Sequence, residues 1–362
     1  MKSLSKYIVV AAILSLSNQT IAQLDNPYIV EKHSISDSIY TFVRPNWLRV
    51  FVVGNATVLK TGEGLIVFDS GNSPYVANQV IEAIKADSDM PVKYLILSHG
   101  HIDHTGGSAR FKQEWPNIEI IGHSSLYNYM KRDEGRLIKY AEGHEERNLK
   151  RDSLLTAYKS LGYSKELLAY FRQYLEVDSK FIADQYRKTS ISLPTLLFED
   201  SLNINLGGNL YTVFKGGNGN TPSDVMLYSR KDKLLITGDV VTRPIPYGYS
   251  DNGVEWTGVL DNILKMDLEV VIPGHGDPLF ETQFIRKQRD LFNYLIGEIR
   301  EAVKNNIELP DMKARLNLEP FRNYFSDNDP VARFRFDDWF IDPFCERNYS
   351  KLKMEHQKNI KK

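Results

Sequence analysis

Residues 98–107 read SHGHIDHTGG, which places three histidines and one aspartate within six positions. They follow the apolar run YLIL at 94–97, so the histidine-rich turn is predicted to leave the end of a β-strand. Imidazole nitrogens and carboxylate oxygens are good zinc ligands, and a catalytic zinc takes about three protein ligands plus a water. His99 and His101 lie two residues apart, so on an extended chain their side chains point the same way. Since one small ion does not comfortably take all four side chains from one tight turn, the stretch predicts two metal ions that share the loop.

This stretch resembles the HxHxDH signature of the metallo-β-lactamase superfamily, and three further segments match that family in the expected order. Asp69 in IVFDSG resembles its buried structural aspartate, Thr237-Gly238-Asp239 its TGD segment, and Pro273-Gly274-His275-Gly276 the segment with its last histidine. The match covers roughly residues 35–280, and four motifs in order are a stronger signal than any one alone. The resemblance implies an α+β fold, an αββα sandwich of two mixed β-sheets with helices outside and metals at the sheet edges.

The resemblance also implies which residues hold the metals. His99 and His101 would bind the first metal, Asp239 would bridge the two metals, and the second metal would be held by Asp103, His104 and His275. The family usually has a third histidine for the first metal in a segment ahead of the strand that precedes TGD. Here Asn220 stands at that place, and an amide oxygen is a weaker zinc ligand than imidazole. We therefore expect two Zn²⁺ ions, with a first site that is weaker or takes another divalent metal.

A zinc-dependent hydrolase follows from this ligand set. Zinc lowers the pKa of a bound water to about 7 and polarises a carbonyl, and Asp103 is predicted as the catalytic residue that orients the nucleophile. An aspartate at the bridging position is typical of the family's esterases, lactonases and thioesterases, so hydrolysis of an ester, lactone or thioester is expected first. A β-lactamase that opens the β-lactam amide is the second interpretation. A degenerate scaffold or binding protein with one metal or none stays open as a third.

Apolar patterning predicts two strand-rich halves, each followed by helices. Strands are expected at 36–43, 55–60, 65–69, 93–97, 118–121, 195–198, 201–205, 210–214, 225–229, 234–237 and 269–272, and helices at 73–86, 105–115, 258–266 and 282–304. Dense charges and helical spacing mark a helical insertion at about 124–186. The expected domains are residues 23–280, containing that insertion, and a helical C-terminal extension at 281–362.

The segment after Asp239 is rich in proline and aromatic residues, so Tyr247 and Tyr249 are candidates to line a substrate pocket, and Trp256 is a further one. The insertion is expected to cover the site and shape specificity. His144 lies in that insertion and could reach the metals only if the segment folds over them. Neither it nor His123 enters the predicted ligand set.

The N-terminus reads as a Sec signal peptide, residues 1–22, with Lys2 and Lys6 ahead of an apolar run and cleavage after Ala22. The run is too short to span a membrane, so a periplasmic or secreted protein without a stable membrane anchor is expected. With 45 basic and 46 acidic residues, charge gives no reason to expect nucleic acid as a partner. Cys345 is the only cysteine, which excludes an intramolecular disulfide. The expected partner is a small-molecule substrate, and the oligomeric state stays open.

Overall fold

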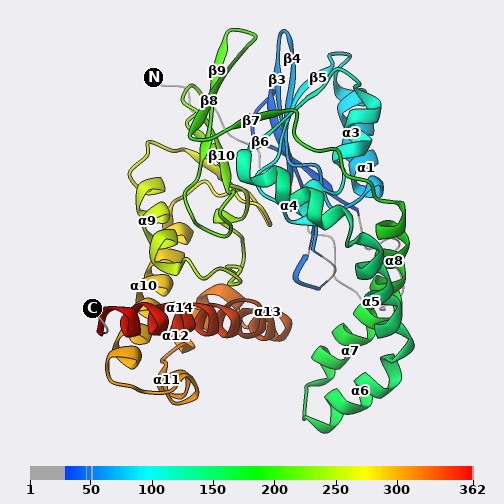
Figure 1. Ribbon diagram of the computed structural model, residues 1–362. Coiled ribbons are helices and arrows are strands. Elements are labelled where there is room, and N and C mark those ends of the chain that lie inside the picture. The colour runs from blue at the N-terminus through cyan, green and yellow to red at the C-terminus, as the bar shows by residue number, and fades with distance from the viewer. Residues whose placement is uncertain (1–28, 46, 50–51, 361–362) are drawn as a thin grey trace, which may run out of the picture.

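The computed structural model describes residues 29–45, 47–49 and 52–360, and within them the strands form two sheets packed face to face (Figure 1). The seven-stranded sheet follows chain order: β1 (Glu31–Ser34), β2 (Ile39–Val43), β3 (Ala56–Thr61), β4 (Gly64–Phe68), β5 (Val92–Ile96), β6 (Glu119–His123) and β7 (Leu196–Phe198). The five-stranded sheet has the order β12 (Val270–Ile272), β11 (Leu234–Ile236), β10 (Val225–Ser229), β9 (Asn209–Lys215) and β8 (Ser201–Leu206). The predicted signal peptide, residues 1–22, lies outside the described residues.

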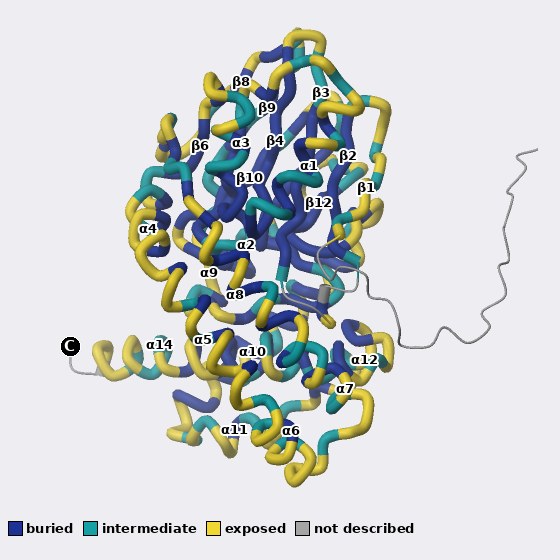
Figure 2. The backbone as a smooth tube through the Cα atoms, turned by 90° about the vertical axis from the view of Figure 1, so that its right-hand side faces the viewer, coloured by how far each residue is buried: buried dark blue, intermediate teal, exposed yellow. Residues whose placement is uncertain are grey.

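The alternation of side chains along β4 explains how the layers form. Ile66 and Phe68 point into the core between the two sheets, whereas Leu65 and Val67 point to the opposite face, where they pack with helix α1 (Pro74–Asp87). Because successive side chains in a strand face opposite sides, a strand that is apolar throughout has to be covered on both faces. The strands in Figure 2 are correspondingly buried while the outer helices carry most of the exposed surface. The predicted αββα arrangement of two mixed sheets is confirmed.

Strand direction changes within the first sheet and brings several loops to one edge. Strands β1 to β4 are antiparallel, whereas β4, β5, β6 and β7 run parallel, and β11 and β12 of the second sheet are parallel too. The carboxyl ends of parallel strands meet at one edge of a sheet, which is where open α/β sheets bind ligands. Every predicted metal ligand except Asn220 follows the carboxyl end of β5, β11 or β12.

The prediction and the structure differ at three elements. The helix expected at 105–115 is two helices, α2 (Ile102–Thr105) and α3 (Ser108–Glu114), broken at Gly106-Gly107. A Cβ at Gly106 or Gly107 would lie 2.2 Å or 2.1 Å from backbone oxygens of residues 72 and 70, so these glycines allow a close approach to the loop after β4. Helix α9 (Gly253–Ile263) begins before the predicted 258–266, and β1 was not predicted.

The predicted insertion is helical and forms an arm beside the first sheet (Figure 1). It contains α4 (Ser124–Glu134), α5 (Leu137–Leu149), α6 (Arg151–Ser160), α7 (Lys165–Gln173), the π-helix η2 (Tyr174–Asp178) and α8 (Ser179–Lys188). Helix α8 packs along α5 and also contacts α1, so the arm is fastened to the outer layer of the first sheet.

The C-terminal residues are helical and share one buried cluster with the second sheet. They form α10 (Gln283–Lys304), α11 (Leu309–Arg315), α12 (Glu319–Ser326), α13 (Pro330–Arg335), the π-helix η4 (Phe336–Ile341) and α14 (Asp342–Ile360). Phe292 and Phe344 lie in one buried cluster with Leu235 of β11 and Leu260 of α9. Contacts of α13 with α7 join these helices to the insertion. None of the helices in the described part of the chain is both long and apolar enough to cross a membrane.

Candidate metal centre

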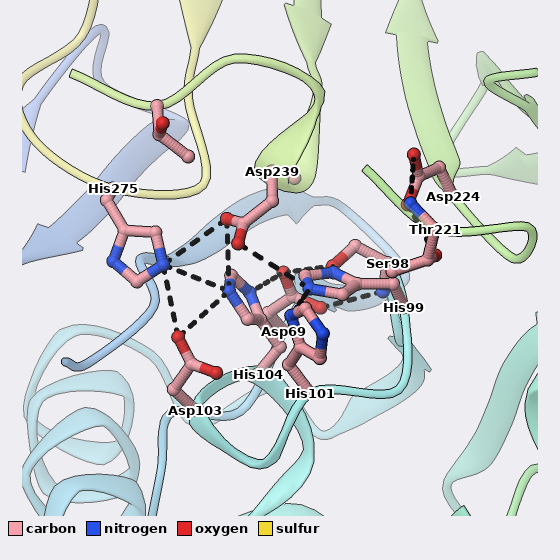
Figure 3. A network of polar contacts seen from close by, with 12 residues as sticks. Asp69, Ser98, His99, His101, Asp103, His104, Thr221, Asp224, Asp239 and His275 are labelled. Carbon is pink, nitrogen blue, oxygen red and sulfur yellow. Dashed lines mark hydrogen bonds and ion pairs between the residues drawn. The ribbon is translucent and has the colours of Figure 1, made fainter. Parts of the chain in front are cut away.

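The histidine-rich turn places its side chains in two groups that face one carboxylate (Figure 3). In the first group, His99 Nε2 lies 2.9 Å from His101 Nδ1 and 3.6 Å from Asp239 Oδ2. His99 is fully buried, and His101 lines a cavity beside the site. Asp239 comes from the short 3-10 helix η3 (Gly238–Val240) that follows β11.

The second group contains Asp103, His104, His275 and the other oxygen of Asp239. His104 Nε2 lies 3.2 Å from Asp239 Oδ1 and 3.4 Å from Asp103 Oδ2. His275 Nε2 lies 3.1 Å from Asp103 Oδ2, 3.3 Å from Asp239 Oδ1 and 3.2 Å from His104 Nε2. The four donor atoms therefore form a compact cage whose separations are nearly equal.

These separations fit a divalent cation. Four ligands about 2.0–2.1 Å from a tetrahedral zinc stand about 3.3–3.4 Å from one another. The second group spans 3.1 to 3.4 Å, which matches that value. Asp239 Oδ1 is buried and has no hydrogen-bond partner among the described residues, although burial without a partner is costly for a carboxylate oxygen. A cation between the four donors supplies the missing interaction, so these residues could hold a metal ion.

Asp69 fixes the orientation of the histidine-rich turn through its contacts with Ser98 and His104. Its carboxylate accepts hydrogen bonds from the Ser98 backbone N–H and hydroxyl, each at 2.7 Å, and contacts His104 Nδ1 at 2.8 Å. With Nδ1 held by a carboxylate, the Nε2 lone pair of His104 is directed at the second group. Ser98 Oγ in turn lies 2.9 Å from His99 Nδ1, which leaves His99 Nε2 facing the first group.

Burial and neighbouring charges shift the pKa values of the histidines and carboxylates of the site in different directions. Burial lowers the pKa of His99 well below its ordinary value. Burial also acts to lower the pKa of His275, but Asp239 and Asp103 outweigh it and raise that pKa to about 9. His104 and His275 act on Asp103 in the same way: burial opposes ionisation, yet the histidines hold the pKa of that carboxyl below its usual range. The second group thus keeps its carboxylates charged, as a cation site requires.

Asn220 lies in a turn next to the first group. The Val225 N–H, at the start of β10, donates to the Ser98 carbonyl at 2.8 Å, which brings the turn against residues 98 and 99 (Figure 3). The carboxylate of Asp224 holds this turn by accepting from the Thr221 N–H and hydroxyl. Both amide atoms of Asn220 are buried without a hydrogen-bond partner. A buried amide in this state costs about 1–3 kcal/mol, so the position fits a polar ligand.

Comparison with known proteins identifies the fold. Residues 49–275 match the family model described as the metallo-beta-lactamase superfamily. The chain belongs to this superfamily. The predicted family is confirmed, and its relatives include hydrolases, in agreement with the predicted class of metal-dependent hydrolase.

Among the relatives, a linear primary-alkylsulfatase of a Pseudomonas species is 23% identical over 278 residues, which are 73% of this chain and 50% of that protein. A probable metallo-hydrolase of Bacillus subtilis is 22% identical over 258 residues, 66% of this chain and 72% of that protein. The solved structure of a stereoselective inverting sec-alkylsulfatase from a Pseudomonas species matches with a TM-score of 0.59 at 16% identity, over 86% of this chain and 50% of that one. The chain thus spans about half the length of the alkylsulfatases it matches.

A cavity of about 490 Å³ opens beside the two metal-ligand groups. Its lining includes His101, Asp103, Asp239 and His275, and further residues come from the insertion: Tyr129, Asp133, Lys139, Tyr140, Gly143, His144, Arg147 and Tyr186. The volume is that of an ordinary small-molecule site. Sequence reasoning placed the insertion over the site but did not identify these residues, except for His144, which does reach the cavity but lies outside both metal-ligand groups.

The three predicted pocket residues differ in position. Tyr247 lines the cavity, with its ring centroid 6.3 Å from that of His101. Tyr249 packs beside Tyr247 at 4.8 Å and is 40% exposed, away from the cavity lining. The prediction for Trp256 is wrong. Its side chain is fully buried in the core, packs on Phe292 and donates a hydrogen bond through Nε1 to the Val240 carbonyl, so it cannot contact a substrate.

Proposed function

We propose that this chain is an exported hydrolase that uses two zinc ions to cleave a carboxylic ester, lactone or thioester. The proposal rests on the position of the Asp239 carboxylate between the two ligand groups. Its Oδ2 faces His99, and its Oδ1 faces His104 and His275. One carboxylate shared between two ligand groups is the arrangement that a bridged pair of metals requires.

The residues of the site would have different roles in metal binding and catalysis. His99, His101 and Asn220 would hold one ion, Asp103, His104 and His275 the other, and Asp239 would bridge them. When bound, zinc lowers the pKa of a coordinated water to about 7 and polarises the scissile carbonyl. Asp103 is partly exposed to the cavity, so its carboxylate is placed to orient the attacking water and to pass a proton to the leaving group. Tyr247 faces the same space and could donate a hydrogen bond to the developing oxyanion.

A sulfate ester is the second candidate substrate. The similarity to alkylsulfatases favours it, because both the sequence match and the structural match extend over most of this chain. Water would then cleave the sulfate ester at the same metal-ligand groups, by attack on its sulfur or on the alkyl carbon with sulfate as the leaving group.

Metal content and turnover test the proposal together. Purified protein is expected to contain two equivalents of zinc by mass spectrometry and to hydrolyse 4-nitrophenyl valerate or an acyl lactone, with loss of activity after chelation. Dodecyl sulfate and nitrocefin are assayed in parallel for the sulfatase and β-lactamase alternatives. Hydrolysis of none of the four in metal-loaded protein, or a metal-free protein that cannot be loaded, would overturn the proposal.

The role of Asn220 has its own test. Asn220→His is expected to raise zinc affinity at the first site, because imidazole is a better zinc ligand than an amide. Asn218→His is the matched control, since Asn218 is exposed two residues earlier in the same turn. Unchanged metal binding in Asn220→His, or an equal gain in both variants, would mean that Asn220 does not face the metal.

A further inference from the structure

One face of helix α5 forms the cavity wall contributed by the insertion. The residues of α5 that line the cavity are Lys139, Tyr140, Gly143, His144 and Arg147. They recur at intervals of three and four, which places them on one side of the helix. Gly143 keeps the middle of this face open, because a Cβ there would meet a single neighbour, Arg147 Nη2, at 3.9 Å. The cavity wall therefore carries two positively charged side chains, Lys139 and Arg147, with open space between them.

These two cations lack acidic partners among the described residues. Neither Lys139 nor Arg147 lies within 4 Å of a carboxylate oxygen in that part of the chain. Arg147 instead contacts a histidine, with its Nη1 3.1 Å from His144 Nδ1. Burial and the charge of Arg147 lower the pKa of His144 to about 3, so its ring is neutral and can accept that hydrogen bond. The imidazole thus holds the guanidinium at the cavity.

Other charges of α5 contrast with these two. Glu146 pairs with Lys150 and Glu145 pairs with Arg187, each away from the cavity lining. Lys139 and Arg147 are both exposed, so an anionic ligand in the cavity can reach them without displacing an acidic partner.

The acidic residues of the cavity do not neutralise the pair. Asp133 is buried, and its carboxylate is contacted by Arg132 and Arg136 at 3.7 Å and 3.4 Å. Asp103 and Asp239 belong to the metal-ligand groups. The α5 wall therefore carries an excess of positive charge, which would raise the local concentration of an anion.

We propose that the substrate of this hydrolase carries an oxyanion, a carboxylate or a sulfate, that Lys139 and Arg147 bind while its scissile bond lies at the metal-ligand groups. This inference rests on the proposed function. Arg147 can form two parallel hydrogen bonds to such a group, and Lys139 adds a point charge across the gap left by Gly143. The rings of Tyr129, Tyr140 and Tyr186 line the space between the two ends and suit an apolar linker.

The test compares two esters of equal acyl length, mono-4-nitrophenyl glutarate, which ends in a carboxylate, and 4-nitrophenyl valerate, which ends in a methyl group. The native enzyme is expected to have at least tenfold higher kcat/KM for the glutarate ester. Arg147→Gln and Lys139→Gln should each reduce that preference about tenfold with little effect on the valerate ester, whereas Arg147→Lys should keep part of it. Lys150→Gln is the control, since Lys150 caps the C-terminus of the same helix and is paired with Glu146.

Equal rates on the two esters in the native enzyme, or the same loss in Lys150→Gln, would overturn the inference. If neither ester is hydrolysed, the ester activity fails, and binding separates the two proposals. Glutarate and propanesulfonate are then titrated calorimetrically into metal-loaded native and Arg147→Gln protein. Weaker binding of either anion by the variant supports the anion site, and the anion that loses more affinity distinguishes carboxylate from sulfate-like groups. Equal binding of both overturns it.

Discussion

At the scale of single residues, the site depends on how closely its loops approach one another. Gly238 has a positive φ of 51°, and a Cβ there would lie 2.6 Å from the Ser98 side chain. Gly274 is tighter: a Cβ would lie 2.1 Å from Asp239 Oδ1 and 2.6 Å from the Gly238 carbonyl carbon. The glycines of the TGD and PGHG segments are therefore required for the ligand loops to fit together.

Gly274→Ala is expected to displace Asp239, because the new methyl group meets backbone and a buried carboxylate, neither of which can move aside. A misplacement of about 1 Å at a catalytic group costs about 100-fold in rate, so kcat/KM for the ester should fall by at least that factor. Metal content measured by mass spectrometry should fall with it. Gly297→Ala is the control: with nothing within 4 Å, it should stabilise helix α10 by about 0.5–1 kcal/mol and leave activity unchanged. Full activity in Gly274→Ala would contradict this close packing of the loops.

The motif residues could be predicted because each is a local signal. Three short segments of sequence predict His99, His101, Asp103, His104, Asp239 and His275 as ligands, and the structure brings all six together. Trp256 shows why the prediction of a pocket residue was wrong. Its spacing to Leu260 and Ile263 is that of one buried helix face, but the helix was expected to begin at Gly258, which left Trp256 outside it.

At the scale of elements, the π-helix η2 contains an unusual buried charge. Asp178 is fully buried, and neither of its carboxylate oxygens has a hydrogen-bond partner in the part of the chain that the structure describes. Burial raises its pKa to about 7, with Arg44 opposing the shift in part. A π-helix of one turn often marks a functional position, and here it turns a carboxyl group into the core of the insertion.

The stability of the protein is expected to depend on pH through Asp178. Because its folded pKa lies above the unfolded value of 3.8, its contribution is fully present below pH 4 and declines as pH rises to about 7. Asp178→Asn stays uncharged, so at pH 8 the variant should be more stable than the native protein by about 1–3 kcal/mol, and at pH 4 the two should be similar. Urea unfolding at both pH values measures this. Asp184→Asn, in the next helix with an exposed carboxylate paired to Lys188, is the control. A difference that does not change with pH would refute the assignment.

Helix periodicity predicted that the insertion exists but not what each face contacts. The apolar spacing in 124–186 indicates a buried side, yet the same spacing suits burial against a sheet, another helix or a cavity. Lys139 and Arg147 look like ordinary solvent-exposed charges in the sequence, and both are exposed in the structure as well. Only the packing of α5 along α8 turns their side of the helix toward the metal-ligand groups.

At the scale of the whole molecule, the insertion and the C-terminal helices support the cavity from two sides. Phe334, just before the end of α13, contacts Phe171 and Tyr163 of the insertion, with ring centroids 5.3 Å and 5.8 Å apart. From η4, Trp339 packs on Tyr247 at 6.4 Å, and Tyr247 faces His101. The C-terminal helices thus contact both the arm that carries α5 and the wall beside the first metal-ligand group.

Phe334→Ala is expected to loosen the insertion without disturbing the metals. Removing a partly buried phenylalanine ring costs roughly 2 kcal/mol, and the loss falls on the contact between α13 and α7. Hydrogen exchange in α6 and α7 should accelerate and KM should rise, while metal content stays the same. Phe321→Ala is the control, since Phe321 stacks on Tyr294 within the C-terminal helices. Unchanged exchange in α6 and α7 would show that this contact does not hold the arm.

The metal ligands and the cavity wall of the insertion come from different segments of the chain. It forms the crossover between the neighbouring parallel strands β6 and β7, a connection that such strands need in any case. All six histidine and aspartate ligands lie outside residues 124–188, while Lys139, Tyr140 and Arg147 lie inside. Substitutions or exchanges within this single segment can therefore alter substrate choice while the reaction is inherited unchanged. Two descendants of one ancestral chain could keep every ligand and still act on different esters, so shared motifs are a poor guide to shared substrates in this lineage.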